Sequence, residues 1–235
     1  MKTKLCKLAI MVSLSLVASA ASAQMPVYSQ NIVGYVNTTF NPGNNLFENP
    51  LASGPDNLTN LFNQGVPNGT TISLWNATQS AFDTTSEYLD GSWTLDLILD
   101  PGTGALLNTP SAFTNTFVGV VLNHDGTYLT GQSGLTPPPV FSGPNGTYLL
   151  GDMAPTVDTG TNIFLNIFGR LPNAGEQVTT LSGTSTYLGN GDWDNVPTLG
   201  VGQAAFFTIE SVPEPNVFSL LGVGILSVCW RMRRT

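Results

Sequence analysis

The feature that most constrains the fold is an internal similarity that returns at a spacing of 100 residues. Gly91-Ser92-Trp93 returns as Gly191-Asp192-Trp193. The stretch from Leu99 to Leu107 likewise matches the stretch from Leu199 to Phe207. When two neighbouring segments recur at the same spacing, the chain typically contains one structural unit twice. The chain is therefore expected to build the same small unit two times.

Upstream of these motifs the similarity continues with a small drift in register. Leu46-Phe47 faces Leu149-Leu150, a slightly larger spacing than in the downstream motifs. A drift of this size is expected where the loops of two copies differ in length. We predict two domains, residues 24–117 and residues 118–211.

Short strands separated by turns are predicted in each copy. Thr70 to Trp75 is β-branched and apolar, and Phe113 to Leu122 and Ala204 to Ile209 are rich in residues that favour strands. Leu58 to Phe62 and Ile163 to Phe168 predict either a helical turn or a buried strand in each copy. The fold class that we predict is all-β, with two similar small β-sandwich or barrel-like repeats. The predicted turns contain residues that tolerate a positive φ or preset a turn: Asn41-Pro42-Gly43, Pro67-Asn68-Gly69, Asp90-Gly91, Asp125-Gly126 and Asn190-Gly191.

Residues 1–23 have the features of a cleaved secretory signal peptide. Three lysines precede an apolar stretch from Leu8 to Val17, and Ala21 and Ala23 then form an A-x-A site. Cleavage by signal peptidase at this site leaves Gln24 as the first residue. We therefore expect the Sec translocon to export the chain.

Residues 212–235 join a proline-flanked acid, an apolar run and a basic cluster. Val212, Pro213, Glu214 and Pro215 predict a stiff extended segment, because proline continues neither a helix nor a central strand. Residues 217–230 predict a transmembrane helix, although this helix spans only about 21 Å of a hydrocarbon core of about 30 Å. The arginines that follow are expected to stop translocation and to keep this end in the cytoplasm: Arg231, Arg233 and Arg234.

This order of elements resembles the PEP-CTERM sorting signal of exported proteins in diderm bacteria. The resemblance implies an exosortase, a membrane transpeptidase that removes the tail after export. It also implies that the protein is first anchored in the inner membrane and then reaches the cell surface or the exopolysaccharide matrix. Pro213, Glu214 and Pro215 are then the recognition residues. The alternative is a plain C-terminal tail anchor.

The residues between the two signals are acidic and free of cysteine. Cys6 and Cys229 lie in the signals, so the body has neither a disulfide nor a thiolate metal site. Of the seven Lys and Arg residues only Arg170 lies in the body, together with all of the 15 Asp and Glu residues except Glu214. The resulting net charge of about −13 repels other polyanions and excludes nucleic acid as a partner.

Two places in the body are candidates for binding a ligand. Asp192, Asp194 and Asn195 bring oxygen-bearing side chains around one turn, and calcium takes such ligands. An Asp/Asn turn without a metal is the alternative, and no other cofactor is predicted. Trp75 is a candidate platform for a sugar ring, because aromatic rings stack on the apolar faces of sugars. Tryptophans 93 and 193 recur in both copies and are predicted to be core residues.

No combination of residues indicates a catalytic site. His124 is the one histidine, and its Asn-His-Asp-Gly context predicts a solvated turn residue. Asp96 with Asp100, or Asp83 with Glu87, have the residue types of a glycosidase, but neither spacing fixes two carboxylates across a cleft.

We therefore expect an exported structural protein of the surface or extracellular matrix that is not an enzyme. A carbohydrate-binding module of the exopolysaccharide matrix is the alternative. A secreted hydrolase is the third hypothesis.

Overall fold

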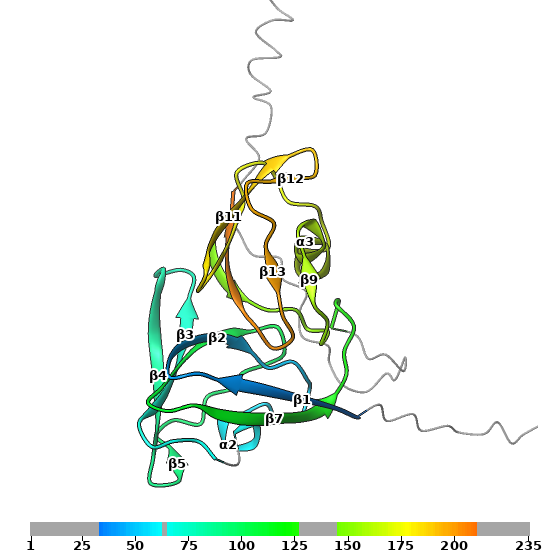
Figure 1. Ribbon diagram of the computed structural model, residues 1–235. Helices are drawn as coiled ribbons and strands as arrows, with labels where there is room; N and C mark the ends of the chain where they lie inside the picture. The colour runs from blue at the N-terminus through cyan, green and yellow to red at the C-terminus, as the bar shows by residue number, and fades with distance from the viewer. Residues whose placement is uncertain (1–32, 63–64, 127–144, 211–235) are drawn as a thin grey trace, which may run out of the picture. The chain divides into compact units, whose positions relative to one another are not determined.

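The computed structural model describes residues 33–62, 65–126 and 145–210 (Figure 1). Within these ranges the chain is mostly β-strand with two short helices, so the predicted all-β fold class is confirmed. The signal peptide of residues 1–23, its cleavage site at Gln24 and the tail of residues 212–235 lie outside the described residues. The transmembrane helix predicted over residues 217–230 lies there too.

A five-stranded antiparallel sheet and helix α2 (Leu58–Leu61) form what we call the first region. The strands follow the order β2-β6-β3-β4-β5 across the sheet. Their bounds are β2 (Gly43–Glu48), β3 (Thr70–Asn76), β4 (Ala81–Leu89), β5 (Ser92–Trp93) and β6 (Gly104–Thr109).

A second five-stranded antiparallel sheet, helix α3 (Thr161–Phe168) and a short strand pair form the second region. Its sheet has the order β8-β14-β10-β11-β12, which places the strands as in the first region when they are matched in chain order. The sheet strands are β8 (Gly146–Leu150), β10 (Gln177–Thr180), β11 (Gly183–Gly189), β12 (Asp192–Trp193) and β14 (Ala205–Ile209). The short pair is β9 (Asp158–Thr159) with β13 (Thr198–Leu199).

A separate two-stranded ribbon is formed by the strands that precede and follow the first region in the sequence. Strands β1 (Val33–Phe40) and β7 (Phe113–Val120) pair antiparallel along their whole length, as Figure 1 shows. Alternate residues of β7 are buried, the period expected for a strand with one face on a core. The predicted domain boundary between residues 117 and 118 falls within β7, and the domain limits stay predictions.

The turn residues explain why corresponding hairpins close in the same way. Asp90 and Gly91 between β4 and β5 have φ values of 49° and 87°, and Asn190 and Gly191 between β11 and β12 have 55° and 95°. Two consecutive positive φ values are those of a type I′ turn, which matches the twist of the strands it joins. These are two of the turns predicted from the sequence.

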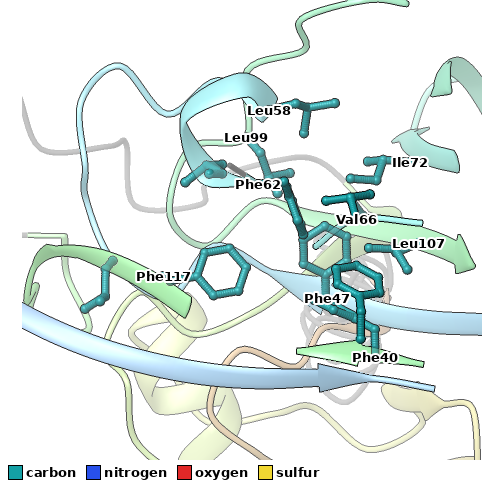
Figure 2. Close-up of a cluster of buried hydrophobic side chains, with 13 residues drawn as sticks. Phe40, Phe47, Leu58, Phe62, Val66, Ile72, Leu99, Leu107 and Phe117 are labelled. Atoms are coloured by element: carbon teal, nitrogen blue, oxygen red, sulfur yellow. The ribbon is translucent and has the colours of Figure 1, made fainter. Parts of the chain in front are cut away.

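The core of the first region is built around Phe62, which directly follows α2 (Figure 2). The ring of Phe62 lies 5.9 Å from that of Phe40, 5.6 Å from Phe47 and 5.6 Å from Phe117. Helix α2 begins after Asn57, whose side chain accepts a hydrogen bond from the backbone N–H of Asn60. The open choice between helix and strand at Leu58 to Phe62 is therefore decided in favour of helix.

The core of the second region is built on α3 in the same way. Ile163, Phe164 and Ile167 are buried against the sheet, on one face of the helix. The ring of Phe164 meets that of Phe207 of β14 edge to face, 5.7 Å away. The helix ends at Gly169, which has the left-handed φ of 65° that favours glycine.

Backbone hydrogen bonds join the two regions in a reciprocal pattern. The N–H of Glu48 donates to the carbonyl of Gly202 (3.1 Å), and the N–H of Gly151 donates to the carbonyl of Gly102 (3.0 Å). Glu48 and Gly151 hold matching positions at the ends of β2 and β8, as Gly102 and Gly202 do in the turns before β6 and β14. Such an exchange is the pattern of a two-fold symmetric contact. Two isolated bridges repeat it: Phe47 with Gln203, and Thr103 with Leu150.

The two-fold pattern is broken at the side chains of Glu48 and Gly151. A Cβ atom added to Gly151 would lie 2.2 Å from Cγ of Glu48, so only one of the two matching positions carries a side chain. The Glu48 carboxylate is 1% exposed and accepts a hydrogen bond from the N–H of Gly102 (3.0 Å). Burial raises the pKa of Glu48 well above its ordinary value, and the charge of Asp152 adds to this effect.

Candidate functional site

The fold brings one histidine from the turn after β7 together with two aspartates of the second region. His124 lies in the turn after β7, Asp152 lies two residues after the end of β8, and Asp158 is the first residue of β9. Their nitrogen and oxygen ligand atoms all lie within 4.8 Å of one another. Among the residues that the structure describes, these three form the group of His, Cys and acidic side chains able to share one ion.

Asp152 is the central residue of this group. Its Oδ2 lies 2.6 Å from Nδ1 of His124, and its Oδ1 accepts the backbone N–H of Ala154 (3.1 Å). The hydroxyl of Thr156 also donates to Oδ2 (3.3 Å). Asp152 is 4% exposed, whereas the His124 side chain is 40% exposed. The group is therefore open to solvent on the histidine side and closed around the carboxylate.

Asp158 is held on one oxygen alone. Its Oδ1 accepts a hydrogen bond from Nδ2 of Asn166 in α3 (2.8 Å). Its Oδ2 is buried and has no hydrogen-bond partner. A buried carboxylate oxygen without a partner is unfavourable and needs a structural explanation.

Burial and the neighbouring carboxyl group raise the pKa of Asp152 to about 6. Loss of hydration is the largest cause, a hydrogen bond with Asp158 is the second, and His124 acts weakly in the opposite direction. Two carboxylates this close resist simultaneous ionisation. The site therefore favours a cation, either a proton or a metal ion, between the two aspartates.

The predicted calcium ligands have another role. Oδ1 of Asp194 accepts the backbone N–H groups of Thr186 (2.7 Å) and Asn195 (2.6 Å), and the bond from Thr186 is the main cause that lowers the pKa of Asp194. At the matching place in the first region, Oγ1 of Thr94 accepts the N–H of Glu87 (2.9 Å). This contact closes a hairpin and needs no cation. Asp192 is exposed in β12, and calcium binding there stays a prediction.

Trp75, the candidate sugar platform, joins the two regions. Its Nε1 donates to the carbonyl of Thr147 in β8 (2.8 Å). Its ring meets those of Phe82 and Phe206 edge to face, at 5.2 Å and 4.9 Å. The indole N–H is thus engaged, and a sugar ring would have to use the part of the side chain that stays exposed.

Tryptophans 93 and 193 pack against the two cores, as their recurrence predicts. Trp93 lies 5.2 Å from Tyr88, and Trp193 lies 5.2 Å from Tyr187, with nearly equal interplanar angles of 63° and 60°. In both tryptophans the buried Nε1 has no hydrogen-bond partner. The two regions therefore share this detail of packing.

One carboxylate of each pair considered for hydrolysis is held by local amide donors. Asp96 accepts hydrogen bonds from Nδ2 of Asn57 (2.6 Å) and from the N–H of Thr59 (2.9 Å), at the start of α2. Asp83 accepts a hydrogen bond from Nδ2 of Asn76 (2.5 Å), which lowers its pKa. Burial raises the pKa of Asp100, with a smaller contribution from the charge of Asp56.

The structure adds to the expectation of a solvated His124 a contact with Asp152, while the histidine side chain stays 40% exposed. The histidine lies in a turn, as predicted, but its ring is hydrogen-bonded to a buried carboxylate whose position the local motif does not reveal. The sequence carried one signal for this site. The register that matches Leu46-Phe47 with Leu149-Leu150 also places Asp152 opposite Asn49, where an acid replaces an amide.

A comparison with protein families accounts for the end of the chain. A family model described as the PEP-CTERM protein-sorting motif matches residues 211–234. The chain carries a PEP-CTERM sorting motif. The match includes the proline-flanked acid of residues 212–215 and the arginines at positions 231, 233 and 234, which lie outside the described residues.

The PEP-CTERM motif implies an exported protein that is anchored in the membrane through this tag, processed by an exosortase and sorted to the surface. Comparisons with curated proteins and with solved structures gave no match. Within the described ranges, no helix is long and apolar enough to cross a membrane.

Proposed function

We propose that this chain is a structural protein of the cell surface or extracellular matrix and that it is not an enzyme. The observation that carries the proposal is the PEP-CTERM motif over residues 211–234, which makes the chain a substrate of the sorting machinery. The chemistry at the tag belongs to the exosortase. Glu214 and the prolines on either side of it are the residues that the exosortase recognises.

The features of the body support a structural role. Fourteen acidic residues against Arg170 favour a hydrated, soluble surface. The hydrolase candidates Asp96 and Asp83 hold local structure through amide donors.

The proposed route begins with export through the Sec translocon and removal of residues 1–23 by signal peptidase. The apolar segment of residues 217–230 then holds the protein in the inner membrane, with Arg231, Arg233 and Arg234 on the cytoplasmic side. Tail removal releases the two sheet regions to the surface or the exopolysaccharide matrix.

Replacing Glu214 and Pro215 by alanine tests the proposal. We expect export to be unchanged and tail removal to be blocked, because the altered residues lie in the recognition segment. Intact mass spectrometry of the membrane and medium fractions measures both outcomes. Asn216→Ala, immediately beside the segment, is the matched control and should be processed normally. Unchanged tail loss in the Glu214/Pro215 variant would overturn the sorting role of these residues.

A further inference from the structure

We propose that His124, Asp152 and Asp158 bind a divalent transition-metal ion of the Zn²⁺ class. This site joins the turn after β7 to the second region, far in sequence from the sorting motif, and the inference does not depend on the proposed function. One imidazole nitrogen and two carboxylate oxygens form a ligand set that suits Zn²⁺ in a site that completes its coordination with water.

The distances between the ligand atoms suit a single ion. All three lie within 4.8 Å of one another. Ligands at the ~2.1 Å bond lengths of zinc are separated by roughly 3–4 Å around the metal. Binding therefore requires the 2.6 Å contact between His124 and Asp152 to open slightly, while Asp158 moves inward. The His124 turn is the part of the site with solvent access, since its side chain is 40% exposed.

Protein donors hold one oxygen of each aspartate, and the hydroxyl of Thr156 bridges the two side chains, at 3.3 Å from Oδ2 of Asp152 and 3.5 Å from Oδ1 of Asp158. Oδ1 of Asp152 is fixed by the N–H of Ala154, and Oδ1 of Asp158 is fixed by the amide of Asn166. Oδ2 of Asp152 contacts His124. Donors that hold the outer oxygen of a metal-binding carboxylate orient the inner oxygen toward the ion. These bonds hold both side chains next to each other, so that metal binding needs only small movements of the ligand atoms.

The unpartnered Oδ2 of Asp158 is the observation that points to a ligand. The residue is 6% exposed, so water satisfies this oxygen poorly, and when Asp152 is ionised no donor of the described residues reaches it. A metal ion bridging Asp152 and Asp158 would satisfy this oxygen and neutralise the two carboxylates together. A hydrogen-bond donor of the protein could also satisfy this oxygen, but it would not neutralise the two carboxylates.

The first region has an amide where the second region has the carboxylate of Asp152. Asn49 and Asp56 lie where Asp152 and Asp158 lie in the second region. The Oδ1 atoms of Asn49 and Asp152 each accept the N–H of the residue two positions later, Leu51 (3.3 Å) and Ala154 (3.1 Å). In the first region, Nδ2 of Asn49 donates to Oδ1 of Asp56 (3.2 Å). In the second region, the matching atom is an oxygen and cannot donate when it is ionised.

The second region also lacks a basic side chain for these carboxylates. Arg170 is the one Lys or Arg residue between Gln24 and Ser211. Its guanidinium forms a bidentate ion pair with the buried Glu176, at 2.7 Å and 2.8 Å. The positive charge that balances Asp152 and Asp158 therefore has to come from His124, from a proton or from a bound ion. A divalent ion with His124 as a neutral ligand satisfies all three groups at once.

Zinc binding by the full-length protein tests the inference. We expect the EDTA-treated protein to bind about one equivalent of ZnCl₂ in isothermal titration calorimetry and to melt at a higher temperature when Zn²⁺ is present, because the ion binds the folded state. Asp152→Asn is the decisive variant. It recreates the amide–carboxylate pair of the first region, so the fold should tolerate it. We expect it to weaken Zn²⁺ binding about 100-fold or more, since a direct ligand is lost.

Two further variants complete the test. Asp192→Asn, in the exposed hairpin of the second region, is the matched control and should keep the wild-type affinity. His124→Gln lies in the more exposed turn, and it gives the same readout as Asp152→Asn if that variant does not fold. Absence of Zn²⁺ binding at 1 mM would overturn the inference. So would equal affinity in the wild type and Asp152→Asn, or a response to Ca²⁺ with none to Zn²⁺.

Discussion

The two sheet regions have the same strand order but differ in one polar corner, and the difference shows how small a change can create a site. In the first region Asn49 donates to Asp56, and Asp56 also accepts from Ser53, so the corner is satisfied by protein atoms. In the second region Asp152 replaces the amide and Asp158 keeps an unpartnered oxygen. The amide of Asn49 forms a hydrogen bond with the neighbouring carboxylate. The carboxylate of Asp152 in its place leaves two acidic groups together, and a cation between them would stabilise the pair.

The cores differ as well. The first core includes Phe40 of β1 and Phe113 and Phe117 of β7, so the two-stranded ribbon thickens it. The core of the second region, among the residues described, consists of α3 side chains on its own sheet. The first region thus gains apolar packing, whereas the second carries the cluster of ionisable groups.

Truncation of the central rings should have the largest effect and tests whether the regions unfold as one unit. Phe62→Ala and Phe164→Ala remove fully buried rings, and each should lower the free energy of unfolding by about 3–5 kcal/mol. Because backbone hydrogen bonds join the regions, both variants should shift the same single transition. Chemical denaturation followed by fluorescence and circular dichroism measures this.

Leu188→Ala is the control for truncation, because this side chain is 60% exposed and its loss should change stability by less than about 0.5 kcal/mol. Two separate transitions, one shifted by each phenylalanine variant, would contradict the view that the regions form one cooperative unit.

Asn49→Asp should place two carboxylates in the first region as well. This substitution removes the amide that donates to Asp56 and to the carbonyl of Leu99, with no histidine to compensate. We expect a loss of about 2–4 kcal/mol at neutral pH, because a buried charge is left without a partner. Thermal melting measures it. In metal-free protein Asp152→Asn should be neutral or stabilising, and a similar loss in both variants would remove the contrast between the regions.

Gly151→Ala tests the broken symmetry at the contact between the regions. The added Cβ would lie 2.2 Å from Cγ of Glu48, so side chain or backbone must move, at an expected cost of about 1–3 kcal/mol. Denaturant titration measures the loss. Adding Glu48→Gly removes the obstructing Cβ, Cγ and Cδ atoms, so the double variant should be more stable than expected from the sum of the two single losses. Additive losses would show that the two positions do not share one space.

The pH dependence of stability should identify the buried carboxyl groups. The pKa of Glu48 is raised well above the ordinary value of 4.5, so the folded state holds a proton that the unfolded chain loses. This contribution is full below pH 4.5 and is lost as the pH rises through the raised pKa of the folded state. Asp152, with a pKa of about 6, acts in the same direction. Glu48→Gln should therefore flatten the decline in melting temperature above pH 4.5, and an unchanged slope would contradict this.

Much of the fold could be predicted because strand and turn signals are local. Thr70 to Trp75 forms most of β3, and the Asp90-Gly91 and Asn190-Gly191 turns have the predicted positive φ values. The choice between helix and strand at Ile163 to Phe168 stayed open, because a short apolar run packs equally well in either form. Packing against the sheet favours the helix, because the helix places Phe164 against the ring of Phe207 in β14.

The site could be predicted less well because it depends on contacts between distant segments. His124 reaches Asp152 only when β8 is in place, and no local pattern around the histidine encodes that approach. The candidate cation ligand Asp194 had suggestive neighbours, but backbone N–H groups take its oxygen. A local cluster of acids is therefore weaker evidence of a site than a substitution between matching positions, such as Asn49 and Asp152.

The reciprocal backbone contacts between the regions also constrain the order in which parts of the chain fold. Glu48 of the first region needs the carbonyl of Gly202, near the end of the second, before its own hydrogen bond forms. Contacts between residues so far apart in sequence slow folding, because a long loop must close before they form. In a chain that appears amino end first, the five strands of the first sheet lie within residues 43–109 and can pair early. The contact between Glu48 and Gly202 must wait until nearly all of the chain has emerged.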